Sequence, residues 1–356
     1  MKGLCGIFRR DDIFRVSRVS LLMNRKNDSR LHVVFASDEN FVLQLEVAAK
    51  SLIKSCAGSE VVVDILDCEI TNQTWEDLSS RLSAYAKMCG TELGVCRHLV
   101  QLDDFAAFRT WNASRATYAR LLIPMFLADV RYCVYSDCDM LFLANPIAMI
   151  NQLKASCKMI AGHLNPRSVD GAKLDFQWLD SVGEPYAEER YYCAGLVAMD
   201  LDQFREKGIM DKVLDFLSRH PDSVSADQSA LNSVCRDFSG IITGTWGLFP
   251  HECYDAHEPI CAIHYSGGNP WKIRTWYEYV LFRRVDRIWQ DFCKSSTGVD
   301  IRRKIRRRSV VVIGALMELV TRLFLFLRIT PASKRNYLLF MRKVLLGDSV
   351  LARTRL

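Results

Sequence analysis

The chain has 356 residues, of which 49% are hydrophobic and 25% charged, with 18 Gly and 9 Pro. This composition excludes a disordered or collagen-like chain, and the length suffices for one large domain or two modest ones. Residues 300–356 hold 14 Lys/Arg and 3 Asp/Glu, a balance of +11, so the net charge of +6 leaves −5 on the first 299 residues. A mildly acidic body with a basic C-terminal region predicts an anionic partner for that region alone.

The N-terminal lead-in segment, residues 1–30, contains no apolar run long enough for a secretory signal. The 13 cysteines of the chain are scattered, odd in number and without a Cys-x-x-Cys pair. This pattern indicates buried, reduced cysteines and no disulfide framework. We therefore expect a cytoplasmic protein.

Strands and helices alternate from residue 31 onward. LHVVFAS (31–37) and EVVVDILDC (60–68) predict buried strands. Residues 38–55 and 71–90 have apolar residues at helical spacing, with Thr74 as N-cap and Gly90 as stop of the second helix. A helix at 114–128, interrupted near Pro124, comes next. The alternation predicts an α/β fold with a doubly wound, mostly parallel sheet flanked by helices.

The apolar run at 130–143 carries two carboxylates, Asp137 and Asp139. Because an unpaired buried charge is costly, this pair needs a compensating group. Asp38 follows the first strand, and ligands of open α/β sheets bind at the carboxyl ends of strands. Mg²⁺ and Mn²⁺ bind carboxylates together with phosphates, so a metal-bound diphosphate is one interpretation. A cap for a helix near Pro146, or surface ion pairs, is the other.

Three later stretches carry polar residues at predicted element ends. ICAIHYSGGNPWK (260–272) brings His264 to the end of an apolar strand, as a metal ligand or as a structural histidine. SADQSALN (225–232) opens a helix with Asp227 and Gln228, and Asp227 alone is also typical of a helix N-terminus. RYYCAGLVAMD (190–200) leads a Cys-Ala-Gly turn into another strand.

In this order, VVFASDENF, TYARLLIP, YSDCDMLFL, YYCAGLVAMD, SADQSALN and HYSGGNPW resemble glycosyltransferase family 8 over about residues 31–275. This family of retaining sugar transferases includes bacterial lipopolysaccharide galactosyl- and glucosyltransferases and glycogenin. The resemblance implies a GT-A catalytic domain, which we place at residues 31–299, with a Rossmann-like sheet. It also implies a UDP-sugar donor and Mn²⁺, with Mg²⁺ as the alternative ion.

The resemblance implies roles for single residues. Asp137, Asp139 and His264 match the metal ligands. Asp227 and Gln228 match the pair at the donor sugar, with the Gln228 amide near the anomeric carbon, and count as catalytic.

The resemblance implies that the remaining matched positions bind the donor. Ala36, Asp38 and Asn40 match residues that hold uridine, and Asp137 also matches a position near the ribose. Arg120 matches an arginine near the donor sugar and diphosphate, which we count as catalytic too. Gly267 matches a backbone contact to the diphosphate.

The chain departs from the family pattern in two places. The family usually has Asn-Ala-Gly where this chain has Cys-Ala-Gly at 193–195, which alters a donor-sugar contact at Cys193 and keeps Ala194 as a donor-binding position. The family usually has Lys before the Pro-Trp of the last motif, where this chain has Asn269. Either Lys272 supplies the phosphate-binding charge from a shifted position, or diphosphate binding is weaker.

We therefore predict a metal-dependent, retaining enzyme that moves galactose or glucose from a UDP-sugar to a glycan or glycolipid such as the lipopolysaccharide core. Metal and protein donors stabilise the leaving diphosphate, and the transition state is oxocarbenium-like. We favour attack on the same face as the leaving group, because the sequence offers no unambiguous nucleophile. The alternatives are a UDP-sugar-binding GT-A protein with weakened catalysis, and a membrane adaptor that acts through the tail.

Residues 300–356 form a predicted basic, helical tail. RRKIRRR (302–308) precedes an apolar stretch at 309–329 whose length would allow a transmembrane span. Because Glu318 and Arg322 are costly in hydrocarbon, we expect a peripheral helix, with residues 302–343 on the anionic inner face of the cytoplasmic membrane. A helix packed on the catalytic domain is the alternative. No nucleic-acid partner is expected.

Overall fold

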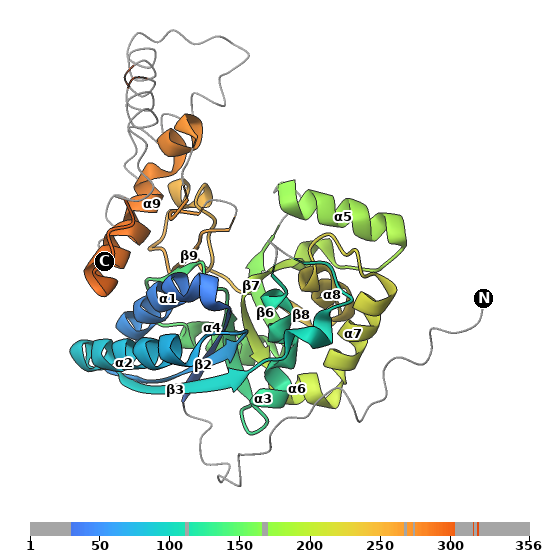
Figure 1. The fold of residues 1–356 in the computed structure, drawn as a ribbon. Coiled ribbons are helices and arrows are strands. Elements are labelled where there is room, and N and C mark those ends of the chain that lie inside the picture. The colour runs from blue at the N-terminus through green and yellow to red at the C-terminus, as the bar shows by residue number, and fades with distance from the viewer. Residues whose placement is uncertain are drawn as a thin grey trace.

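The computed structural model describes residues 30–110, 114–165, 170–266, 269–272, 275–302, 316 and 319. A seven-stranded sheet forms its centre, in the order β3-β2-β1-β4-β7-β6-β8 (Figure 1). Within this sheet, β7 runs antiparallel to its neighbours β4 and β6, and the other pairs are parallel. The predicted mostly parallel sheet is therefore confirmed. Its strands are β1 (Leu31–Ser37), β2 (Glu60–Asp67), β3 (Glu92–Leu99), β4 (Tyr132–Ser136), β6 (Ile160–Leu164), β7 (Tyr192–Asp200) and β8 (Ser239–Ile241).

A second, two-stranded sheet pairs β5 (Met140–Phe142) with β9 (Ala262–His264) in antiparallel register. The apolar run at 130–143 is thus two strands, β4 and β5, which belong to different sheets. The turn between them carries the acidic pair, Asp137 and Asp139. The two carboxylates therefore lie at the junction of the sheets and not inside a strand.

The helices of the described chain cover both faces of the main sheet. On one face, α1, α2 and α4 pack on residues such as Val33, Phe35 and Val63. On the other face, α5 to α8 and the segment before α3 pack on residues such as Val34 and Tyr135. Because helices cover both faces of the sheet in this three-layer arrangement, the sequences of the central strands are continuous apolar runs. The helices are α1 (Val42–Ser55), α2 (Asn72–Cys89), α3 (Ile123–Phe126), α4 (Ile147–Ser156), α5 (Asp170–Val182), α6 (Leu201–Glu206), α7 (Ile209–Arg219), α8 (Asp227–Val234) and α9 (Trp276–Thr297).

Two local predictions differ from the structure. The N-cap of α2 is Thr71, whose side chain accepts a hydrogen bond from the backbone N–H of Thr74, so Thr74 lies inside the helix. Gly90 ends α2 in the left-handed conformation, as predicted. The expected helix at 114–128 is mainly 3₁₀ (Ala116–Leu122) before the short α3, whose first turn contains Pro124. Proline is tolerated there because the first helical N–H groups have no intrahelical partner.

Some predictions fall outside the described residues: the lead-in segment up to residue 29, Gly267, and the tail from 303 onward except 316 and 319. In the part of the chain that is described, no helix has the length and apolarity to cross a membrane. Every cysteine described is unpaired, and most are buried. The domain boundaries stay a prediction.

Candidate active site

Backbone pairing brings the acidic turn and His264 together. The backbone N–H of Asp137 donates to the Gly195 carbonyl at 2.7 Å, which ties the turn to β7. The β5–β9 register places Met140 opposite His264, and the N–H of Tyr265 donates to the Asp139 carbonyl at 2.9 Å. Because neighbouring residues on paired strands lie within side-chain reach, the ladder places the His264 ring beside Asp139.

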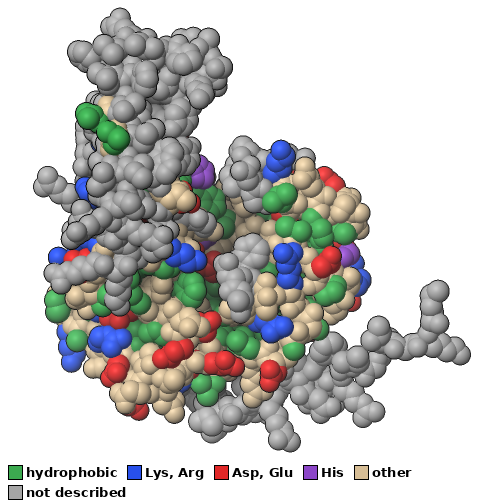
Figure 2. All heavy atoms as spheres, turned by 45° about the horizontal axis from the view of Figure 1, so that its top comes forward, with side chains coloured by type: hydrophobic (Ala, Val, Ile, Leu, Met, Phe, Trp, Pro, Cys, Tyr) green, Lys and Arg blue, Asp and Glu red, His purple; other side chains and the backbone are tan. Residues whose placement is uncertain are grey.

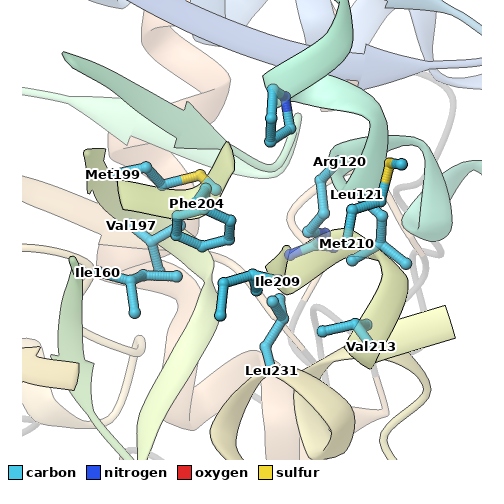
Figure 3. Close-up of a pocket in the computed structure, with 11 residues that line it drawn as sticks. Arg120, Leu121, Ile160, Val197, Met199, Phe204, Ile209, Met210, Val213 and Leu231 are labelled. Carbon is cyan, nitrogen blue, oxygen red and sulfur yellow. The ribbon is translucent and has the colours of Figure 1, made fainter. Parts of the chain in front are cut away.

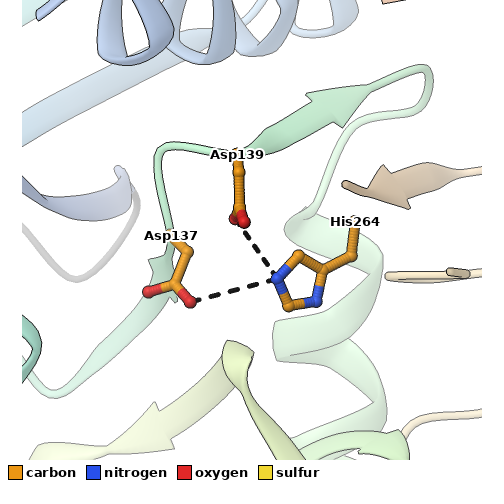
Figure 4. Close-up of side chains that lie close together, drawn as sticks. All are labelled: Asp137, Asp139 and His264. Carbon is orange, nitrogen blue, oxygen red and sulfur yellow. Dashed lines mark ion pairs between the residues drawn. The ribbon is translucent and has the colours of Figure 1, made fainter. Parts of the chain in front are cut away.

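The side chains of Asp137, Asp139 and His264 form a cluster, called here the Asp-Asp-His cluster (Figure 4). One ligand atom from each residue lies within 4.8 Å of the others. Nε2 of His264 is 3.2 Å from Oδ1 of Asp139 and 4.0 Å from Oδ2 of Asp137. Asp139 Oδ1 is buried and accepts no hydrogen bond from a described residue.

Two carboxylates and one imidazole are ligands that a divalent cation accepts, so these residues fit a metal ion. The alternative role as a helix cap is wrong: the N-cap of α4 is Pro146, with no side-chain capping bond.

The electrostatics of the cluster also favour a cation. Its enclosed position raises the pKa of Asp137; the Arg120 guanidinium lowers this pKa, and the neighbouring Asp139 carboxylate raises it. Burial by itself lowers the pKa of His264, but the Asp139 carboxylate and the Cys193 side chain together outweigh burial and hold this pKa well above its usual value. The two neighbouring carboxylates therefore repel each other, and a bound metal ion would supply the positive charge that offsets this repulsion.

Arg120 joins the acidic turn to the start of α8. Its Nη2 donates to Asp137 Oδ1 at 3.1 Å, and its Nε lies 2.8 Å from Asp227 Oδ2. Nη1 donates to the Ala194 carbonyl at 2.5 Å, and Nε and Nη2 also donate to Thr117. Burial lowers the pKa of Arg120, but the two carboxylates outweigh it and raise this pKa. All three guanidinium nitrogens are engaged by the protein itself.

The other side of Arg120 is apolar. Its side chain and those of residues from β6, β7 and the helices α6 to α8 enclose a cavity of about 10 Å³ (Figure 3). A space of this size holds one water molecule at most. The guanidinium is therefore held by its carboxylate and carbonyl partners and not by solvent from behind.

Asp227 and Gln228 open α8 beside Arg120. Ala226, just before them, has φ +50°, an uncommon conformation for a residue other than glycine. Asp227 is 2% exposed, and its Oδ1 accepts a hydrogen bond from Thr117 Oγ1 at 2.7 Å. Gln228 Oε1 accepts from the Ala194 N–H at 3.0 Å, which leaves the Nε2 amide without a hydrogen-bond partner among the described residues.

The predicted turn at 193–195 is instead part of strand β7, where it lies next to Arg120, Gln228 and the Asp-Asp-His cluster. Ala194 binds Arg120 through its carbonyl and Gln228 through its N–H. A Cβ on Gly195 would lie 2.5 Å from His264 Cε1 and 2.8 Å from Asp137 Oδ2. Real side chains do not approach so closely, so only glycine fits at position 195.

The predicted uridine-binding residues lie at the carboxyl end of β1. Asp38 accepts hydrogen bonds from the Asn40 N–H at 3.0 Å and from Ser114 Oγ at 3.1 Å. The Ala36 carbonyl accepts from Cys138 Sγ at 3.2 Å, so this end of β1 touches the acidic turn. One face of the molecule is hollowed at its centre, and acidic side chains are visible in the hollow (Figure 2).

The last motif lies next to α1. Trp271 meets the Phe41 ring edge-on, with centroids 6.4 Å apart. In the amide orientation that satisfies its neighbours, the side-chain oxygen of Asn269 accepts from Lys272 Nζ at 3.0 Å. Lys272 is exposed, and among the described residues its Nζ binds this amide and no member of the Asp-Asp-His cluster.

Sequence reasoning missed several residues that hold the site. The Tyr135 hydroxyl donates to Asp137 Oδ1 at 2.7 Å, and its ring lies under the Arg120 guanidinium. The Phe249 ring stacks on His264, with centroids 5.3 Å apart. Nothing in the local pattern distinguishes these residues from ordinary core residues. The signal is their contact with residues far away in the sequence, which only the fold provides.

A Rossmann-like sheet with an Asp-Asp-His cluster at the carboxyl ends of its strands defines a glycosyltransferase of the GT-A fold. Residues 32–275 match the family model described as "Glycosyl transferase family 8". The chain belongs to this family, as its sequence motifs predicted.

Individual relatives are distant. General stress protein A of Bacillus subtilis (strain 168) is 22% identical over 279 residues, which are 71% of this chain and 92% of that protein. Glycosyltransferase GlyE of Streptococcus pneumoniae serotype 4 is 25% identical over 272 residues, 70% of this chain and 60% of that protein. The crystal structure of the galactosyltransferase LgtC with donor and acceptor sugar analogs superposes with a TM-score of 0.62 at 20% identity, covering 74% of this chain and 96% of that one. At this low identity, the structural similarity to LgtC shows a shared fold.

Proposed function

We propose that the protein transfers a hexose, galactose or glucose, from a UDP-sugar to a glycan or glycolipid such as the lipopolysaccharide core, with retention and with Mn²⁺. The observation that carries this proposal is the Asp-Asp-His cluster at the carboxyl end of the sheet, next to the Arg120–Asp227 ion pair. The similarity to LgtC, crystallised with donor and acceptor sugar analogs, supports a galactosyl or related donor.

Asp137, Asp139 and His264 would hold the cation. When bound, the ion would neutralise charge on the leaving diphosphate. On the protein side, Arg120 orients Asp137 and Asp227 together, because one guanidinium binds both carboxylates.

The contacts of Asp227 favour same-face attack over a covalent intermediate. Asp227 is 2% exposed, its Oδ1 accepts a hydrogen bond from Thr117, and its Oδ2 is ion-paired with Arg120, so burial and pairing disfavour this carboxylate as a nucleophile. Among the described residues nothing accepts a hydrogen bond from the Gln228 amide at the same helix end, so this donor is suited to a sugar hydroxyl or to the anomeric oxygen. The acceptor hydroxyl would then give its proton to the departing phosphate oxygen.

The test is hydrolysis and transfer with UDP-galactose and UDP-glucose, with Mn²⁺ and with excess chelator. We expect Mn²⁺-dependent turnover that Asp139→Asn abolishes, together with the metal-dependent part of UDP binding. The matched control is Asp222→Asn, which changes an exposed aspartate. Full activity of Asp139→Asn or in chelator contradicts the proposal. Binding of UDP-sugar without any turnover supports instead a weakened, donor-binding protein.

For the tail we propose peripheral binding to an anionic membrane surface through residues 302–343. The support is the sequence alone: basic clusters beside apolar stretches, in a chain whose first 299 residues are net acidic. Each cation near such a surface contributes about 1 kcal/mol, so salt should weaken the binding, while apolar burial should leave a salt-resistant part. Fractionation of the full chain and of a chain lacking 301–356 tests this. A truncated protein that stays in the membrane pellet contradicts it.

A further inference from the structure

The two ring nitrogens of His264 have different neighbours. Nε2 faces the carboxylates of Asp139 and Asp137. Nδ1 lies 3.6 Å from Sγ of Cys193, a contact within the range of a sulfur hydrogen bond. This thiol is the partner that Nδ1 has among the described residues, and Cys193 is itself buried at the start of β7.

The rest of the imidazole is fixed by packing. His264 is 3% exposed, and Phe249 stacks on its face at 5.3 Å and 27°. Gly195 lies so close to Cε1 that even a methyl group would collide with the ring. The ring has little room to move, so the choice of which nitrogen carries hydrogen decides whether Nε2 can bind a cation.

A metal-binding histidine uses one unprotonated nitrogen and keeps hydrogen on the other. When Nε2 binds a cation between the carboxylates, the remaining hydrogen must be on Nδ1, where a buried N–H needs an acceptor. A cysteine sulfur is a weak acceptor, but it lies at that position. Outer partners of this kind set the orientation of metal-binding histidines.

We infer that Cys193 is a positioning residue for the metal site: its sulfur accepts the Nδ1–H hydrogen bond of His264 and so keeps the Nε2 lone pair directed at Asp137 and Asp139. The inference rests on the proposed metal-dependent function. Cys193 is not a ligand, because it is absent from the cluster whose ligand atoms lie within 4.8 Å of one another. This positioning role of Cys193 is separate from the altered donor-sugar contact that the family resemblance implies at the same position.

The experiment titrates Mn²⁺ alone into metal-free protein by isothermal calorimetry, without donor or acceptor. Cys193→Ala should lower Mn²⁺ affinity by about 10- to 100-fold, the usual effect of losing an outer partner. Cys193→Asn should restore most of the affinity, because its amide oxygen can accept from Nδ1–H. Cys193→Val, which keeps bulk but offers no acceptor, should bind as weakly as Cys193→Ala. The matched control is Cys133→Ala, a buried cysteine of β4, which should bind Mn²⁺ normally.

A double mutant separates positioning from general packing. In a His264→Gln background there is no ring to orient, so Cys193→Ala should cause no further loss of Mn²⁺ affinity. An equal loss in both backgrounds overturns the inference, and so does a lower melting temperature of metal-free Cys193→Ala with unchanged affinity. If the wild type binds no Mn²⁺, the proposed metal site and this inference both fail. If the wild type binds and Cys193→Val binds equally well, the inference alone fails.

Discussion

Replacing Gly195 by alanine should damage the metal site more than the fold. The added Cβ would lie 2.5 Å from His264 Cε1, whereas carbon atoms in contact are about 3.5–4.0 Å apart, so the ring or the strand must move by about 1 Å. The ring is buried and stacked on Phe249, and the second close atom, Asp137 Oδ2 at 2.8 Å, belongs to another ligand. The methyl group therefore pushes two ligands of the same ion apart.

The expected loss of metal affinity follows from the cost of overpacking at Gly195. Overpacking of this kind costs about 1–3 kcal/mol. If binding an ion requires the ligands to return against the methyl group, this cost appears as a loss of metal affinity of about 10- to 100-fold, since about 1.4 kcal/mol is tenfold. Transfer should fall further, because a reacting group displaced by about 1 Å costs about 100-fold in rate.

The assay is calorimetric titration of Mn²⁺ into metal-free protein, with thermal unfolding measured in parallel. The control is Gly240→Ala in β8, whose Cβ would meet Lys158 Cγ at 3.0 Å, a flexible chain that can yield. Gly240→Ala should bind Mn²⁺ like the wild type. The reasoning is refuted if Gly195→Ala binds Mn²⁺ with wild-type affinity, or if Gly240→Ala weakens binding as much.

Three further predictions concern residues around α8. Gln228→Ala should lower turnover far more than UDP affinity in steady-state kinetics, because its donor acts as charge develops; equal losses would limit it to shaping the nucleotide site. Thr117→Val, which removes the hydrogen bond to buried Asp227, should cost about 1–3 kcal/mol in urea unfolding and lower the transfer rate, and an unchanged variant would contradict the network. Burial raises the pKa of Asp175 to about 6 from 3.8, so the folded chain holds this proton more tightly and stability declines as pH rises through this window. Relative to wild type, the free energy of unfolding of Asp175→Asn should therefore rise by about 2 kcal/mol between pH 4 and pH 7 in urea unfolding; parallel pH profiles would contradict this.

Local pattern by itself determined the layered α/β fold and the residue types of the site. Apolar runs such as 31–37 and 60–67 bury both faces of a strand, and the alternation with amphipathic helices leaves few arrangements other than a parallel sheet. The carboxylates Asp137 and Asp139 stand out because charges interrupt an apolar run there. His264 and the start of α8 were marked by their places at element ends, and the order of the motifs indicated the family.

Only the tertiary structure decided how these residues meet. The β5–β9 register places His264 beside Asp139, and a shift by one residue would turn its ring to the other face of the strand. The absence of space around Gly195 and the contact of the Cys193 thiol with His264 arise from packing between segments far apart in the chain. The single guanidinium of Arg120 shared by two carboxylates is another contact of this kind. Such contacts cannot be predicted from local sequence, because they depend on which strands become neighbours and how closely their backbones approach.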